Sequence, residues 1–137
     1  MRWADQLIKL SKFELEVLQV RLADVVQRRT IAELRLAVLI AEGEAELMHA
    51  RTNPEAGWYL AQFNEGLAMR KAAVQREIDL AAAEEAGARD ALSEAFEALK
   101  KYEMIAENAR LVAVKETARI DGAVLDELGL RQAIARG

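Results

Sequence analysis

Two pairs of adjacent carboxylates are the residues of this sequence whose type and spacing could do acid–base chemistry. They are Glu84-Glu85 and Asp126-Glu127. Two carboxyl groups in a pocket that excludes water can serve as general acid and general base, because their surroundings drive their pKa values apart. Both pairs, however, lie in long stretches that predict helix. In coiled coils such charges usually face solvent or form interhelical ion pairs, and we interpret them in that way.

Other catalytic and ligand-binding motifs are absent from the sequence. The single histidine, His49, has no second histidine or cysteine with which to share a metal, and we expect it at the surface near a turn. Neither G-x-x-x-x-G-K-[ST] nor G-x-G-x-x-G occurs, and no nucleophile elbow is found. The paired Glu-x-x-His motifs of a di-iron helical bundle are also missing. We therefore predict a protein that is not an enzyme, with no metal and no cofactor.

The composition is typical of long helices. Of the 137 residues, 53% are hydrophobic, 31% are charged and 5% are aromatic, and the chain has one proline and no cysteine. The net charge of −4 argues against binding to a nucleic-acid backbone. No apolar run is long enough to span a membrane, and the first residues do not resemble a signal peptide. We therefore expect a cytoplasmic protein.

The only proline lies in the segment "ARTNPEAGW", which separates two stretches with helical patterns. Proline is favoured at the first position of a helix, and Thr52 and Glu55 have the spacing of a capping box. We predict an all-α fold of one domain, 1–137, formed by two long helices in an antiparallel coiled-coil hairpin. The first helix is expected over about 3–51, the turn at 52–54, the longer second helix over about 55–121, and a frayed tail over 122–137, because Gly122 and Gly129 interrupt it.

Apolar residues alternate by three and four along both predicted helices, as in a coiled-coil seam. In the first helix this series, broken only by Arg29, is Leu15, Leu18, Leu22, Val25, Ala32, Leu36 and Leu39. In the second helix it is Leu60, Leu67, Val74, Ile78, Ala81, Ala88, Leu92, Ala95, Leu99 and Tyr102. This arrangement sets Gly43 opposite Gly66, either as a closely packed point or as two surface glycines.

The first helix carries a second apolar stripe with the same spacing. Its members are Leu10, Phe13, Val17, Val20, Ile31, Leu34, Val38, Ala41 and Met48. One interpretation is a second face that needs a further partner, since a two-helix hairpin buries only one face of each helix. The other is that a single broad stripe covers both sets.

The second helix outruns the first, because Trp3 pairs with a residue near Ala106 when residues are counted outward from the turn. The remaining segment still carries apolar residues such as Leu111, Val112 and Ile120. We therefore expect a helical overhang that makes contacts of its own. Trp58 and Tyr59, beside the turn, are a smaller contact candidate.

The stretch "FEALKKYEMIAENARLVAVKETARIDGAVLDELGLR" resembles the C-terminal region of the FliJ family of flagellar type III export proteins. The resemblance lies in Leu99-Lys100-Lys101-Tyr102-Glu103 and in Asp126-Glu127 preceded by Leu125. It implies a non-catalytic, stalk-like export chaperone whose terminal end enters the ring of the hexameric flagellar export ATPase. It further implies contacts with the membrane-embedded export gate and with substrate chaperones, and a position close to the inner membrane through the export apparatus.

Two sets of residues are predicted to make these contacts. For the ATPase they are Arg110, Leu111, Lys115, Arg119, Asp126 and Glu127. For the gate or a chaperone they are Phe13, Val17, Val20, Arg21, Arg28 and Ile31. A self-assembling helical scaffold or coat protein, acting as a homodimer or four-helix bundle, is the alternative function.

Overall fold

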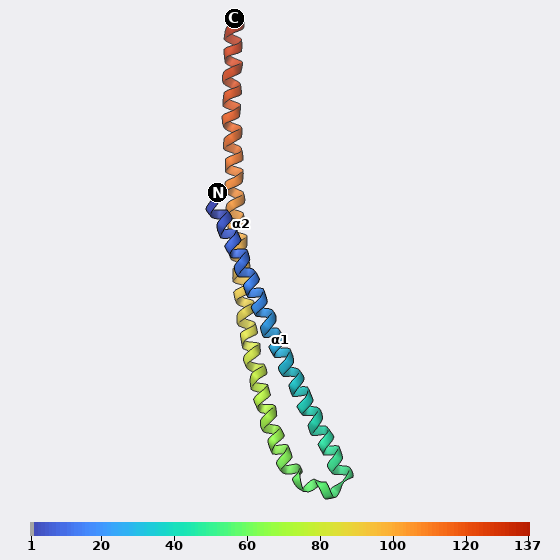
Figure 1. The fold of residues 1–137 in the computed structure, drawn as a ribbon. Coiled ribbons are helices and arrows are strands. Elements are labelled where there is room, and N and C mark those ends of the chain that lie inside the picture. The colour runs from blue at the N-terminus through green and yellow to red at the C-terminus, as the bar shows by residue number, and fades with distance from the viewer. Residues whose placement is uncertain (1) are drawn as a thin grey trace. The chain divides into compact units, whose positions relative to one another are not determined.

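The computed structural model describes residues 2–137, apart from the side chain of Ala56. Helix α1 covers Arg2–Thr52, a 3-10 helix η1 covers Pro54–Tyr59, and helix α2 covers Leu60–Arg136 (Figure 1). No strand occurs among these residues. The predicted all-α class, with two helices of which the second is longer, is confirmed.

Contacts within the chain define two compact units, which we describe separately. The hairpin unit is Glu16–Ser93, and the terminal unit is Met1–Leu15 with Glu94–Gly137. In the hairpin unit, α1 and α2 run antiparallel on either side of η1 (Figure 1). Its buried apolar residues, the best-covered part of the predicted seam, are Val25, Ala32, Leu67, Val74, Ala81 and Ala88.

The remaining seam residues of this unit are half-buried, so the predicted apolar series identifies the covered face of both helices. Alanines at 32, 81 and 88 leave little side-chain bulk between the two backbones, which favours a narrow interface. Most of each helix surface nevertheless stays exposed, since each helix has only one neighbour.

The turn is longer than predicted. The six residues of η1 separate Thr52 from Leu60, so α2 begins at Leu60 and not near residue 55. The capping box is also absent. The Thr52 hydroxyl donates instead to the carbonyl oxygens of Met48 and His49, and Asn53 makes no side-chain cap. Thr52 therefore closes α1 instead of opening α2.

This longer turn shifts the pairing of the helices. Gly43 lies against Leu67, not Gly66: a Cβ at Gly43 would lie 2.6 Å from the Leu67 Cδ2 atom. Gly66 is exposed and has no atom within 4 Å of such a Cβ. Gly43 is thus a close-packed point, and Gly66 is a surface glycine.

In the terminal unit, the start of α1 packs against α2 through Ala4, Ser11 and Leu99, all of which are buried. Asp5 and Ile8 line a shallow groove with residues of α2 between Glu103 and Ala113. Beyond this groove α2 continues without a neighbouring helix of its unit (Figure 1). The predicted frayed tail over 122–137 is wrong, because α2 remains helical through Gly122 and Gly129 to Arg136.

Neither α1 nor α2 contains a window that is long and apolar enough to cross a membrane, within the residues that the structure describes.

Candidate interaction surfaces

Three ion pairs join the helices along one edge of the hairpin unit. Arg28 donates to Glu84 at 2.7 Å and Arg35 donates to Glu77 at 2.6 Å. One heptad further along α1 the charges reverse, and Glu42 lies 4.0 Å from the guanidinium of Arg70. The seven-residue spacing therefore places each of these α1 side chains opposite an α2 residue of opposite charge.

A fourth pair lies inside the seam. The Glu85 side chain is 10% exposed, and its Oε2 lies 2.8 Å from Nε of Arg29. That Nε makes no aligned hydrogen bond among the described residues, whereas Nη2 donates to Oε1 of Glu85 at 3.4 Å. Arg89 also donates to Oε1, at 2.9 Å. Two guanidinium groups thus compensate one nearly buried carboxylate, which would be costly alone.

Arg29 is the one polar residue in the predicted seam of α1, and Glu85 explains how it is accommodated. The sequence identified the break but not the partner. Glu85 follows Ala81 by four residues and precedes Ala88 by three, which is seam spacing on α2. An opposite charge at the facing seam position was therefore the signal that could have located this pair. Glu84 and Glu85 both bind arginines of α1, in agreement with the interpretation of this pair as residues of interhelical ion pairs.

The second apolar stripe of α1 is a separate, exposed face. In the hairpin unit its large side chains are between 49% and 71% exposed: Val17, Val20, Ile31, Leu34, Val38 and Met48. Leu10 and Phe13, in the terminal unit, are exposed as well. The alternative of one broad stripe that buries both sets is therefore wrong. Among the residues described, these side chains have no packing partner.

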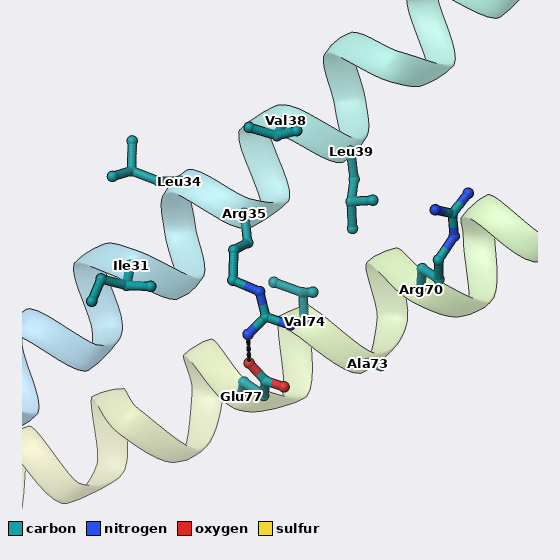
Figure 2. Close-up of a pocket in the computed structure, with 9 residues that line it drawn as sticks. All are labelled: Ile31, Leu34, Arg35, Val38, Leu39, Arg70, Ala73, Val74 and Glu77. Atoms are coloured by element: carbon teal, nitrogen blue, oxygen red, sulfur yellow. Dashed lines mark hydrogen bonds and ion pairs between the residues drawn. The ribbon is translucent and has the colours of Figure 1, made fainter.

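A groove of about 480 Å³ runs beside this stripe in the hairpin unit (Figure 2). Ile31, Leu34 and Val38 line it from α1, and Ala73 and Val74 line it from α2. Figure 2 shows Leu39 and Val74 directed toward the opposite helix, whereas Leu34 points away from α2. The Arg35–Glu77 ion pair bridges the helices within the groove. Arg70 of α2 lines it as well, so the groove is a mainly apolar surface that also carries the Arg35–Glu77 pair and one further arginine.

The structure does not bring all the predicted partner-binding residues together. Val17, Val20, Arg21, Arg28 and Ile31 belong to the hairpin unit, and Phe13 belongs to the terminal unit. Val17, Val20 and Ile31 share the exposed stripe. Arg28 is occupied by Glu84 and Asp24, and these carboxylates raise the pKa of its guanidinium. Arg21 makes no ion pair within residues 2–137.

The predicted ATPase-binding residues all lie on the exposed end of α2. We define this overhang as residues 111–136, with Arg110 at its base. Arg110 forms an ion pair with Glu107 at a nitrogen–oxygen distance of 2.7 Å, and Arg119 forms an ion pair with Glu116 at 2.7 Å. These hydrogen bonds lower the pKa of both glutamates. Both pairs support the helix locally, and the Arg119–Glu116 pair does so where the described residues show no packing against α1.

The overhang also exposes large apolar side chains on several sides of the helix. They are Leu111, Val112, Val114, Ile120, Val124, Leu125, Leu128, Leu130 and Ile134. A helix with apolar residues around its surface is normally covered. Together with the charged residues Lys115 and Asp126, they make the overhang a candidate contact surface.

The turn presents a smaller surface. Trp58 is 84% exposed and lies edge-on to Tyr59, with ring centroids 5.9 Å apart. The Tyr59 hydroxyl donates to Glu46 at 2.6 Å, and this bond raises the pKa of the phenol. Tyr59 thus anchors η1 to α1, while Trp58 remains free for contact.

Comparison with known proteins connects these surfaces to a family. A curated protein named "Flagellar FliJ protein" from Caulobacter vibrioides strain NA1000 / CB15N is 48% identical over 136 residues, which cover 99% of this chain and 98% of the relative. The protein of the same name from strain ATCC 19089 / CIP 103742 / CB 15 matches equally well. The chain belongs to the FliJ family.

This membership confirms the family that the C-terminal stretch of the sequence resembles. The match extends over both units of this FliJ-family chain, including the overhang and the exposed stripe of α1. No protein-family model matches the chain, and no solved structure matches it significantly.

Proposed function

We propose that this FliJ-family chain, a component of flagellar protein export, acts as a non-catalytic stalk that links the export ATPase to other parts of the apparatus. In this proposal the overhang inserts into the ring of the hexameric ATPase. The exposed stripe of α1 receives the export gate or a substrate chaperone. The protein carries out no reaction and works by positioning its partners.

The exposed overhang is the observation that carries the proposal. From Leu111 to Arg136 α2 has no neighbouring helix, yet it carries apolar residues such as Leu125, at 66% exposure, and Ile134, at 70%. A surface of this kind on a soluble protein marks a contact site. A single projecting helix is narrow enough to enter a channel that would be too narrow for two packed helices.

The charges of the overhang point to particular contact residues. Arg110 and Arg119 are held by glutamates one turn away, so binding a partner carboxylate would require them to exchange ion pairs. Lys115 and Asp126 make no ion pair within residues 2–137. We propose that Leu111 and Lys115 make the principal contacts and that Asp126, Glu127, Arg110 and Arg119 set the orientation.

Binding of the purified export ATPase to charge variants of the full chain tests this assignment. Lys115→Glu combined with Arg119→Glu should weaken binding at least tenfold, because both substitutions reverse charge on the overhang. Arg76→Glu is the matched control, since Arg76 is an exposed arginine of the hairpin unit. Equal affinities for the two variants would contradict the proposed contact surface.

A scaffold or coat protein remains the second candidate, and the exposed stripe of α1 is the observation that favours it. In that role the chain acts as a homodimer or four-helix bundle through this stripe. Light scattering of the purified protein tests it: a stable dimer or tetramer supports the scaffold, and a chain that stays monomeric at micromolar concentration contradicts it. Binding of the export ATPase distinguishes the stalk.

A further inference from the structure

The exposed stripe of α1 has a complete heptad pattern within the hairpin unit. Positions 17, 24, 31, 38 and 45 alternate with 20, 27, 34, 41 and 48, and only Asp24 and Gln27 are polar. This is the a/d pattern of a coiled-coil seam, and it lies on a face that α2 leaves exposed. Its natural occupant is another helix with an a/d seam.

We propose that this occupant is α1 of a second copy, packed antiparallel across a twofold axis between Ile31 and Leu34. In this register Ile31 faces Leu34 of the second copy and Val17 faces Met48 of the second copy. Every a position from 17 to 45 then faces a d position between 20 and 48 of the second copy. A twofold interface uses the same patch on both chains, so the assembly closes at a dimer.

The polar positions of the stripe decide the orientation. In a parallel pair each residue at heptad position a faces the equivalent residue of the second chain, so Asp24 would face Asp24 of that chain. In the antiparallel pair Asp24 faces Ala41 and Gln27 faces Val38. Asp24 also accepts a hydrogen bond within its own helix from Arg28, at 3.2 Å. The antiparallel pair therefore avoids burying two like charges against each other.

The charges beside the stripe complement one another in the same orientation. Antiparallel packing brings the e positions of the two helices together, and these positions include Arg21 and Glu42. Arg21 has no ion-pair partner within residues 2–137, and Glu42 has only the 4.0 Å contact with Arg70. Arg21 of one chain and Glu42 of the other can therefore form two symmetric ion pairs. Arg28 and Arg35, which approach each other, are already neutralised by Glu84 and Glu77.

The groove provides room for the second chain. It lies beside Ile31 and is lined mainly by apolar side chains of α1 and α2. Leu34 of the second copy faces Ile31 in the proposed register and can enter the groove. Pairing would cover the same stripe that is proposed to bind the gate or a chaperone, so the dimer and that complex would exclude each other. The pairing itself does not depend on the ATPase contact.

Sedimentation equilibrium of the full chain measures the proposed dimer. The wild type should approach twice the 15.2 kDa chain mass at high micromolar concentration.

Leu34→Glu should weaken dimerisation about a hundredfold, because it places a carboxylate in an apolar interface. Leu34 is 61% exposed, so the variant should keep the wild-type circular dichroism spectrum. Met104→Glu, at a residue that is 66% exposed on α2 of the terminal unit, should dimerise like the wild type. A wild type that stays monomeric, or equal weakening by both variants, would overturn the proposal.

Single cysteines determine the orientation, since the natural chain has none. A mixture of Val17→Cys and Met48→Cys chains should form the mixed disulfide under oxidising conditions, and neither variant alone should form a disulfide-linked dimer. Disulfides within each single-variant sample would contradict the antiparallel register.

Arg21→Glu should weaken the dimer at least fivefold, and adding Glu42→Arg should restore it. No recovery in the double variant would contradict the proposed ion pair.

Discussion

Helix α1 carries two apolar faces of the same spacing in the hairpin unit, and only one of them is buried. Val25 and Ala32, on the seam, are 2% and 4% exposed, whereas Val20 and Leu34, on the stripe, are 71% and 61% exposed. Both faces carry large apolar side chains, since the seam also contains Leu22 and Leu36. Apolar bulk alone therefore does not explain which face α2 covers.

The difference follows from complementarity between the helices. The seam of α2 offers small residues, Ala81 and Ala88, and one carboxylate, Glu85, that meets Arg29. If α2 covered the stripe instead, Arg29 would lose its partner. A charged residue within a seam thus selects one face at some cost in stability, as buried polar groups do in other coiled coils. The unselected face stays available for partners.

The largest expected effect comes from placing a charge on each face in turn. Val25→Asp should lower the free energy of unfolding by about 3–4 kcal/mol, because Val25 is 2% exposed and Arg29, one turn away, is already bound to Glu85. Val20→Asp, on the 71% exposed stripe, should change it by less than about 0.5 kcal/mol at concentrations low enough to keep the chain monomeric. Urea unfolding followed by circular dichroism measures both values. Similar losses for the two variants would contradict the distinction between a structural seam and a free stripe.

Removing the charge of Glu85 from the seam should lower the free energy of unfolding by an intermediate amount. Glu85→Gln leaves the half-buried Arg29 without its carboxylate, and we expect a loss of about 1–2 kcal/mol. Glu84→Gln is the matched control, because the Glu84 side chain is 49% exposed and its loss should cost less than about 0.5 kcal/mol. If both variants unfold at the same urea concentration, Glu85 does not select the seam.

The two glycines give a smaller contrast. Gly66→Ala should stabilise α2 by about 0.5–1 kcal/mol, because alanine favours helix and the site is open. Gly43→Ala should gain less or lose stability, since its Cβ would lie 2.6 Å from Leu67 Cδ2 and that side chain must move. Thermal unfolding of the two variants compares them directly. Equal stabilisation would show that the seam is not closely packed at Gly43.

The smallest effect concerns pH and the overhang. Arg110 and Arg119 lower the pKa of Glu107 and Glu116 below the usual value of 4.5. The stabilisation by these pairs is therefore fully present above about pH 4.5 and is lost as the pH falls through the lowered values. Carboxyl carbon NMR titration of the full chain should show both midpoints below 4.5, and Arg119→Gln should raise only that of Glu116. A Glu116 midpoint that does not move would contradict the assigned cause.

Much of the fold was predictable, because apolar spacing determines which residues can share a covered face. The seam positions from Leu15 to Leu39 and the presence of the overhang both followed from it. The apolar spacing did not predict which residues of α1 and α2 lie opposite each other, because that pairing depends on how many residues η1 contains. The length of η1 depends on the local geometry around Pro54 and Tyr59. The prediction that α2 ends near Gly122 is wrong, because a single glycine reduces helix stability without ending the helix.

The candidate contact surfaces were predicted in part. The sequence identified the exposed stripe and the charged residues of the overhang. It did not show that Arg28 binds Glu84, because that pair depends on the register between the two helices. The pairs of Arg110 with Glu107 and of Arg119 with Glu116 lie three residues apart within α2, and this spacing was a signal in the sequence.

Binding of the purified export ATPase to a shortened chain tests the central claim most directly. Cutting after Arg110 removes the whole overhang, including Leu111 and Lys115, and keeps most of the groove that Asp5 and Ile8 form with α2. The shortened chain should remain helical but lose ATPase binding, while full-length Leu34→Glu should bind like the wild type. Retained ATPase binding by the shortened, folded chain would contradict the assignment of the overhang as the ATPase contact.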